Sequence, residues 1–311
     1  MTLASYTTAE TAAQPQCWRR AADEVPAQHD RLPRRGERVA VVGCGTSWFM
    51  AQAYAWLRER GGHGITDAFA ASQFPAGREY DLIVAISRSG TTTEVLDLLA
   101  AQPDGARTLA LTADPKTPIM DAADEVCVLD FADERSVVQT RFATSALALL
   151  RAHLEAEDAL PAGVRTVDQA AADAERVLAL PLPEGAAGAE QITFLGDGWT
   201  CGLASEAALK MREAAGAWTE AYPAMEYRHG PISITGPRRI AWLFGDVPAG
   251  LDEDIARTGG SLIAASRTAD ELDPMADLVR VHRLAVGVAV AAGRDPDQPR
   301  NLTRSVILSP A

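Results

Sequence analysis

The chain has 311 residues, of which 47% are hydrophobic and 23% are charged. This composition is globular, and the length allows two ordinary domains or one large one. The formal net charge of −13 opposes binding to nucleic acid or to an anionic membrane. No apolar run is long enough to cross a bilayer, and the first residues lack the pattern of a signal peptide. We therefore expect a cytoplasmic protein without nucleic-acid or membrane partners.

The cysteines are far apart in the sequence and include no CxxC pair; they are Cys17, Cys44, Cys127 and Cys201. This spacing argues against a zinc site and against a disulfide scaffold. A reducing compartment is the simplest setting for such a chain. We expect no bound metal and no cofactor.

The first 35 residues are polar apart from Trp18, and we expect an N-terminal helical segment over residues 1–35. From residue 36 to residue 180, continuous apolar runs alternate with helix-like stretches. The predicted strands are 38–43, 82–86, 108–112 and 126–129, and the predicted helices are 46–60, 92–101 and 140–156. Such alternation is typical of a parallel sheet that is covered on both faces.

A Pro- and Gly-rich break at 180–188 predicts a boundary, so we expect subdomains over 36–180 and 181–311. The pattern then restarts. The predicted strands are 192–198, 239–244 and 261–265, and the predicted helices are 200–217 and 284–292. The strand and helix that open this part resemble those that open the first part, about 150 residues earlier. The sequence therefore predicts an α/β protein with an internal duplication.

The segment 87–92, with the sequence Ser-Arg-Ser-Gly-Thr-Thr, joins a buried strand to a helix. A helix N-terminus supplies free N–H groups and positive potential, and Gly90 allows close approach of an anion. Ser87, Ser89 and Thr92 add hydroxyl groups, and Thr91 with Glu94 matches a capping box. These residues could simply cap a helix. Their number at the carboxyl end of a strand favours a phosphate-binding turn.

The turn 43–47 occupies the equivalent place after an earlier strand and begins like a dinucleotide-binding G-x-G-x-x-G motif. Trp48 stands where the third glycine should be, and its bulk opposes close packing of the helix on the strand. We therefore interpret Ser47 as a hydroxyl donor to the same ligand. A nicotinamide-dependent oxidoreductase is kept only as a third hypothesis, which a titration with NADH would test.

The predicted helix 200–217 carries Glu206, Lys210 and Glu213, which lie within roughly 60° of one another at 3.6 residues per turn. A solvated ion-pair stripe is the usual explanation for this spacing. The rest of the helix is rich in Ala, Leu and Met, and it begins at a glycine-rich strand end, which favours an acid–base site. His229 follows in a charged, turn-rich segment and is a candidate partner in catalysis.

Together these motifs resemble the SIS (sugar isomerase) family, and in particular the isomerase half of glutamine–fructose-6-phosphate aminotransferase. The resemblance covers nearly the whole chain in matching order. It rests on Gly43-Cys-Gly-Thr-Ser47, Ser87-Arg-Ser-Gly-Thr-Thr92, Glu134-Arg-Ser-Val137, Ala207-Ala-Leu-Lys-Met-Arg-Glu213, Glu220-Ala-Tyr222, His229-Gly-Pro231 and Asp297-Gln-Pro-Arg-Asn-Leu302. It implies a fold of two doubly wound parallel-sheet SIS subdomains of similar topology.

The resemblance also implies roles for individual residues. The sugar phosphate would be held by Ser47, Ser87, Arg88, Ser89 and Thr92. Glu213 would carry the proton between C1 and C2, and Lys210 would steady the developing charge. His229 would assist ring opening from the neighbouring subunit, so we expect a homodimer with a shared active site. Further candidate contacts to the substrate are Thr46, Val137, Gln139, Glu206 and Arg304.

Three departures from the family pattern narrow the expected reaction. The resemblance covers only the isomerase half, so we expect no glutaminase domain and do not expect glutamine to be the nitrogen source. Arg304 stands where the aminotransferase has a lysine that forms an imine with the ketose, and a guanidinium cannot form that imine. Gln139 replaces a ligand-binding serine. These departures favour isomerisation through an enediol or enolamine.

The leading hypothesis is therefore an isomerase or deaminase of an amino-sugar phosphate, of the type that converts glucosamine 6-phosphate to fructose 6-phosphate. The alternative is a sugar-phosphate sensor without catalysis. A sensor that regulates transcription is disfavoured, because the residues ahead of the first strand show no helix-turn-helix pattern and no basic face. The identity of the sugar is left open by the sequence.

Overall fold

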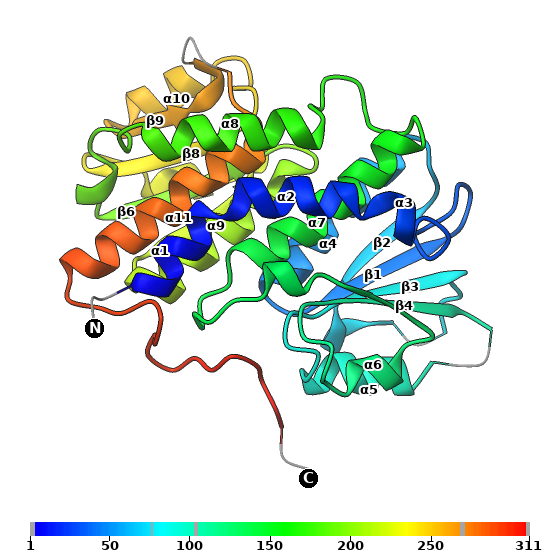
Figure 1. Cartoon of the computed structure of the whole chain (residues 1–311). Coiled ribbons are helices and arrows are strands. Elements are labelled where there is room, and N and C mark those ends of the chain that lie inside the picture. The colour runs from blue at the N-terminus through cyan, green and yellow to red at the C-terminus, as the bar shows by residue number, and fades with distance from the viewer. Residues whose placement is uncertain (1–3, 76, 103–104, 268–270, 309–311) are drawn as a thin grey trace. The chain divides into compact units, whose positions relative to one another are not determined.

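The computed structural model of the chain describes residues 4–75, 77–102, 105–267 and 271–308. These residues form an α/β protein with two parallel sheets (Figure 1). The chain divides into two compact units, which we describe separately. The five-stranded unit comprises Gln16–Arg135, Gln139–Asp168 and Thr303–Ala311, and the four-stranded unit comprises Met1–Pro15, Ser136–Val138 and Gln169–Leu302.

The sheet of the five-stranded unit has the strand order β2-β1-β3-β4-β5, and all neighbouring pairs are parallel. Its strands are β1 (Val39–Gly43), β2 (Thr66–Ala70), β3 (Leu82–Ile86), β4 (Arg107–Thr112) and β5 (Glu125–Val128). The order reverses direction at β1 and β3. In open α/β sheets, ligands bind at the carboxyl ends of the strands that flank such a reversal.

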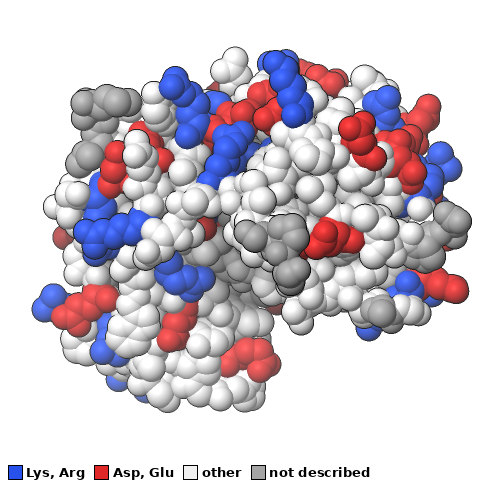
Figure 2. Space-filling model, turned by 90° about the horizontal axis from the view of Figure 1, so that it is seen from below, with Lys and Arg blue, Asp and Glu red and all other residues white. Residues whose placement is uncertain are grey.

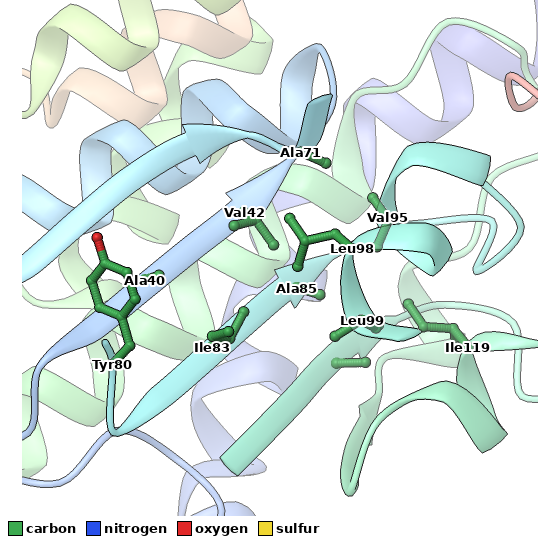
Figure 3. Close-up of a cluster of buried hydrophobic side chains, with 11 residues drawn as sticks. Ala40, Val42, Ala71, Tyr80, Ile83, Ala85, Val95, Leu98, Leu99 and Ile119 are labelled. Carbon is green, nitrogen blue, oxygen red and sulfur yellow. The ribbon is translucent and has the colours of Figure 1, made fainter. Parts of the chain in front are cut away.

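The helices in this part of the chain are α2 (Gln14–Asp23), α3 (Val25–Gln28), α4 (Thr46–Arg60), α5 (Thr93–Ala100), α6 (Ile119–Ala122) and α7 (Arg141–Ala156). Helix α4 packs on β1, β2 and α7. Figure 3 shows a buried apolar cluster in which Ala40, Val42, Ile83 and Ala85 of the strands meet Leu98 of α5. These strand residues are buried because helices cover both faces of a parallel sheet.

The four-stranded unit repeats the first four positions of that topology, with the order β7-β6-β8-β9 and only parallel pairs. Its strands are β6 (Gln191–Gly196), β7 (Thr219–Pro223), β8 (Arg239–Phe244) and β9 (Ser261–Ala264). The helices are α1 (Ser5–Ala12), α8 (Val167–Ala179), α9 (Thr200–Ala215), α10 (Leu251–Arg257) and α11 (Pro274–Ala291). Helix α9 packs on β6, β7 and α11.

The structure confirms the predicted fold class of two parallel-sheet α/β subdomains of similar topology. Several elements were not predicted from the sequence, namely β2, β7, α8 and α10. The last helix was predicted to begin at residue 284 but begins at Pro274, where the Asp273 side chain accepts the N–H of Met275. This capping bond fixes the true helix start.

No described helix is long and apolar enough to cross a membrane. On the face drawn in Figure 2, basic and acidic side chains lie among one another and among uncharged residues.

Candidate active site

Two turns follow the strands that flank the reversal in the five-stranded sheet. Gly43 at the end of β1 is the register partner of Ile86 at the end of β3. The segments 43–47 and 87–92, which we call the phosphate turns, therefore leave the sheet side by side. The helices that they open, α4 and α5, point their N-termini toward this edge, which is favourable for an anion.

Close approach of α4 to β1 depends on Gly43. A Cβ atom there would lie 2.7 Å from Ser47 Cβ and 2.9 Å from the Trp48 nitrogen. This close contact is made at Gly43, ahead of the position where Trp48 replaces the third glycine of the motif. Thr46 and Ser47 are buried in the first turn of α4.

In the second phosphate turn, Gly90 has φ +60°, and a Cβ atom would lie 2.1 Å from Thr117 Oγ1. Only glycine satisfies both constraints. Ser87 is 4% exposed, and its buried Oγ has no hydrogen-bond partner among the described residues. Ser89 is also buried, and its Oγ accepts the N–H of Thr91 at 3.3 Å. An unpaired buried hydroxyl is unusual, and a bound ligand atom would satisfy it.

The predicted capping box is wrong. Helix α5 begins at Thr93, and its N-cap is Thr92, which makes no side-chain capping bond. The Thr91 hydroxyl instead donates to Ser305 Oγ at 3.0 Å. Thr92 is extended, with φ −66° and ψ 120°, so the helix starts after it and Glu94 falls outside the capping-box position.

Arg88 is buried and points into the protein. Its Nη1 lies 3.7 Å from Glu134 Oε2, and its Nη2 donates to the Arg304 carbonyl at 3.1 Å. The Glu134 carboxylate also accepts the N–H groups of Thr140 and Arg141 at the start of α7, at 2.6 and 2.8 Å. In this structure Arg88 therefore stabilises the turn through Glu134, whose carboxylate lies at the N-terminus of α7.

The segment 304–308 runs along the second phosphate turn. Arg304 Nη2 lies 2.5 Å from Asp133 Oδ1, and Nη1 donates to the Glu134 carbonyl. The Thr93 N–H donates to the Val306 carbonyl at 3.2 Å. Arg304 thus tethers the tail in this structure. Of the other candidate contacts in this region, Gln139 has a buried Nε2 without a partner among the described residues.

The four-stranded unit holds the other predicted residues. Glu206, Lys210 and Glu213, which we call the acid–base triplet, lie along α9. Lys210 is 1% exposed; its Nζ donates to Glu213 Oε2 and lies 3.6 Å from Glu206 Oε1. Glu206 is fully buried, whereas the Glu213 side chain is 19% exposed. Glu213 is therefore the carboxylate of the triplet that faces outward.

Two residues behind the triplet were missed by sequence reasoning. His282 Nε2 lies 3.8 Å from Glu206 Oε1, and His282 Nδ1 lies 3.0 Å from Gln14 Nε2. Both side chains are buried. They come from the opposite ends of this unit's sequence, so no local pattern could have linked them to α9.

A pocket of about 340 Å³ opens beside Glu213. Its lining includes Arg212, Arg294, Arg300 and Asn301. The lining also holds the carboxylates of Glu213 and Asp295, so the three arginines outnumber the acidic groups by one. This small excess of positive charge favours an anionic substrate although the whole chain is acidic. Asn301 and Arg300 belong to the motif 297–302 noted in the sequence. Val137, another candidate contact, donates its N–H to the Asp297 carbonyl at 3.3 Å.

His229 ends the short 3-10 helix Glu226–His229 and is exposed. Among the described residues, none forms a hydrogen bond or an ion pair with its ring, so the structure does not join it to the acid–base triplet. This leaves its predicted role untested within one chain.

The cysteines next to the two glycine-rich strand ends are not nucleophiles at neutral pH. Burial, followed by the Asp197 charge, raises the pKa of Cys201 to about 11. Burial likewise raises the pKa of Cys44, aided by the charge of Glu94. Because thiol chemistry requires the thiolate, neither residue competes with Glu213 as the reactive group.

A larger pocket of about 640 Å³ in the five-stranded unit is unsuited to a phosphate. Its lining includes the acidic residues Glu79, Glu94 and Asp97 and a single basic residue, Arg78. The excess of carboxylates would repel a dianion.

Comparison with known proteins agrees with this geometry. Residues 34–156 match the SIS domain family, so the chain carries a SIS domain. The chain is also homologous to curated isomerizing glutamine–fructose-6-phosphate aminotransferases. It is 29% identical to that of Thermus thermophilus over 88% of this chain and 52% of the relative. It is 30% identical to that of Sulfurisphaera tokodaii over 88% of this chain and 50% of the relative. It thus spans about half the length of these relatives.

Solved structures share the fold. The glucosamine-6-phosphate deaminase of Thermotoga maritima matches with a TM-score of 0.80 and 22% identity, covering 97% of this chain and 99% of that one. The tagatose-6-phosphate ketose/aldose isomerase of Escherichia coli also gives 0.80, with 20% identity and coverages of 98% and 96%. The C-terminal domain of the Francisella tularensis aminotransferase gives 0.73, with 20% identity and coverages of 94% and 98%.

Proposed function

We propose that the protein is an aldose–ketose isomerase of an amino-sugar phosphate that also releases the amino group, of the type that converts glucosamine 6-phosphate and water to fructose 6-phosphate and ammonia. The observation that carries the proposal is the acid–base triplet. A partly exposed carboxylate, Glu213, contacts the buried ammonium of Lys210 and lines a pocket rich in arginine.

The proposal assigns substrate binding to the phosphate turns. The free hydroxyl of Ser87 and the hydroxyls of Ser47, Ser89 and Thr92 would donate to the phosphate oxygens. The N-termini of α4 and α5 would add positive potential. Arg88 would act mainly by holding the second turn through Glu134, since its guanidinium is already engaged in the protein.

The proposal assigns proton transfer to Glu213. The carboxylate would take the proton from C2 of the open-chain sugar and return it to C1, which converts the aldose amine to a ketose imine. Water would then add to the C2 imine carbon and ammonia would leave. Lys210 would stabilise the negative charge that develops on O1 in the enolamine. A single carboxylate that can reach both carbons is sufficient for this exchange.

A covalent imine with the enzyme is not part of the proposal. The chain has only two lysines, Lys116 and Lys210. Lys210 is enclosed between two glutamates, and Lys116 is exposed in the loop before α6. Arg304 occupies the place of the relatives' tail lysine, and its guanidinium stays protonated.

We further propose that the protein acts as a homodimer and that His229 assists ring opening in the site of the partner subunit. The exposed position of His229 at the end of a short helix supports this assignment. Mixing Glu213→Gln and His229→Ala subunits tests it: heterodimers with a shared site recover activity that neither variant shows alone.

The function is tested by coupled detection of ammonia and ketose phosphate on a panel of hexosamine and hexose phosphates. The wild type should turn over an amino-sugar phosphate, and Glu213→Gln should bind the same compound without turnover. Glu190→Gln, an exposed carboxylate outside the pocket, is the matched control. Binding without turnover by the wild type on the whole panel would instead identify a sensor.

A further inference from the structure

Three of the five histidines of the chain gather in the five-stranded unit, away from the phosphate turns. His29 follows α3, His63 lies in the loop between α4 and β2, and His153 lies on α7, one helical turn before Glu157. The phosphate turns follow the carboxyl ends of parallel strands, whereas His63 precedes the amino end of β2. The cluster is therefore at the opposite edge of the sheet.

The geometry of the cluster is that of a metal-binding group. One ring nitrogen each of His29 and His153 and one carboxylate oxygen of Glu157 lie within 4.8 Å of one another. His29 Nε2 is 2.9 Å from Glu157 Oε1, and His63 Nε2 is 3.5 Å from Glu157 Oε2. His153 lies in the last turn of α7, and Glu157 is the residue that caps its C-terminus. Because the two residues are four apart, their side chains lie on the same face of the helix end.

Two ring nitrogens in the cluster have no partner. His153 is 2% exposed and His63 is fully buried, and the Nδ1 atom of each lacks a hydrogen-bond partner among the described residues. An unsatisfied buried nitrogen is costly and needs an explanation, such as an ion or a water molecule that the ring would bind.

Two cations limit the affinity of such a site. Arg35 Nη2 donates to the Glu157 carbonyl at 2.6 Å, and Arg58 Nη2 donates to the His63 carbonyl at 3.2 Å. Asp30, next to His29, offsets part of this charge. Binding should therefore be weaker than at a cysteine-rich structural zinc site.

We propose that His29, His153 and Glu157, with His63 beside them, form a site for a divalent transition-metal cation of the zinc class. Imidazole and carboxylate ligands suit this class, and tetrahedral coordination would draw the ligand atoms to about 3.4 Å from one another. Exposed His29 can make most of this movement. A pocket of about 210 Å³ lined by His29, His153 and Glu157 gives an ion access. The metal would hold α3 against the end of α7. It would not take part in the proposed reaction, because none of its ligands belongs to the phosphate turns or to the acid–base triplet.

The test uses the full chain after removal of metals with a chelator. Calorimetric titration with Zn²⁺, and absorption of a Co²⁺ complex, should show one ion per chain and a higher melting temperature. His29→Ala, at an exposed position that tolerates substitution, and Glu157→Gln should each weaken binding by about 10–100-fold or more. His229→Ala removes a histidine from the other unit and should leave binding unchanged. The proposal is overturned if the wild type takes up no stoichiometric ion, or if His29→Ala binds as tightly as the wild type.

Discussion

The two sheets share one topology but carry different side chains at their edges. Both reverse direction after their first strand, and both end that strand in a glycine packed against the following helix. At Gly196 an added Cβ would lie 2.4 Å from the Thr200 carbonyl, as at Gly43 it would lie 2.7 Å from Ser47 Cβ. The two units therefore share a glycine at the position where the backbone of the helix packs closely on the end of the strand.

The side chains on this backbone differ. Counted from the two glycines, the acid–base triplet of α9 corresponds in α4 to Ala53, Leu57 and Arg60. Gly43 pairs in register with Ile86, and Gly196 pairs with Phe244. The second phosphate turn, which follows Ile86, therefore corresponds to the segment after Phe244. That segment begins Gly245-Asp246-Val247-Pro248 and has no hydroxyl. The five-stranded unit thus carries the hydroxyl-rich turns, and the four-stranded unit carries Glu206, Lys210 and Glu213. Substitutions in the two units should therefore have different effects on ligand binding, turnover and stability.

The largest effect is expected from Glu213→Gln. Loss of the base should lower kcat by about 10²- to 10⁴-fold with little change in affinity for the sugar phosphate. Steady-state kinetics and calorimetry on the same preparation separate the two quantities. A variant that keeps wild-type kcat would remove Glu213 from the mechanism, and Glu190→Gln controls for the loss of a charge.

The Lys210→Met substitution should lower the free energy of unfolding by removing the ion pairs of the triplet. Removing the ammonium leaves the carboxylate of buried Glu206 without its main counter-charge, which should cost about 3–5 kcal/mol in the free energy of unfolding. Adding Glu206→Gln should restore much of that stability but not activity. Denaturant titration checks both variants; equal stability of wild type and Lys210→Met would contradict the buried ion pair.

Gly43→Ala and Gly196→Ala compare the equivalent strand ends of the two units. Each should destabilise its unit by roughly 1–3 kcal/mol, because a methyl group must be inserted into a closed contact. The effect should be greater at Gly196, where the added atom meets backbone at 2.4 Å. Gly188→Ala is the control, since nothing lies within 4 Å of a Cβ at that position. Thermal unfolding would reject the argument if all three variants behaved alike.

Ser87→Ala separates ligand binding from folding. Its hydroxyl has no bond to lose in the protein, so stability should be unchanged. Loss of a hydrogen bond to a charged phosphate should raise KM by about tenfold or somewhat more. If stability fell and KM did not change, the hydroxyl would belong to the fold rather than to the ligand.

The smallest effect is expected from Arg304→Ala. The side chain is 38% exposed, so loss of its ion pair with Asp133 should cost at most about 1 kcal/mol. Hydrogen exchange at Thr93, whose N–H donates to the Val306 carbonyl, should rise as the tail loosens. Unchanged exchange would show that the tail is held by its other contacts.

The sequence predicted the fold class because buried parallel strands give continuous apolar runs, as in β1, β3, β6 and β8. It missed β2 and β7, which are less buried and carry polar residues such as Asp67 and Glu220. The two turns and the charged triplet of α9 are local patterns, so they could be singled out from the sequence, and their roles stay predictions. Pairing of Arg88 with Glu134, and of His282 with Glu206, depends on contacts between distant segments, which no local pattern reports.

The central claim is that Glu213 moves a proton on a bound sugar phosphate. It is tested most directly by NMR of a hexosamine phosphate incubated with the protein in D₂O. The account predicts that the wild type incorporates solvent deuterium at the carbons that exchange the proton, and that Glu213→Gln binds the compound without incorporation. Equal incorporation by wild type and Glu213→Gln, or none by the wild type with a bound sugar phosphate, would contradict it.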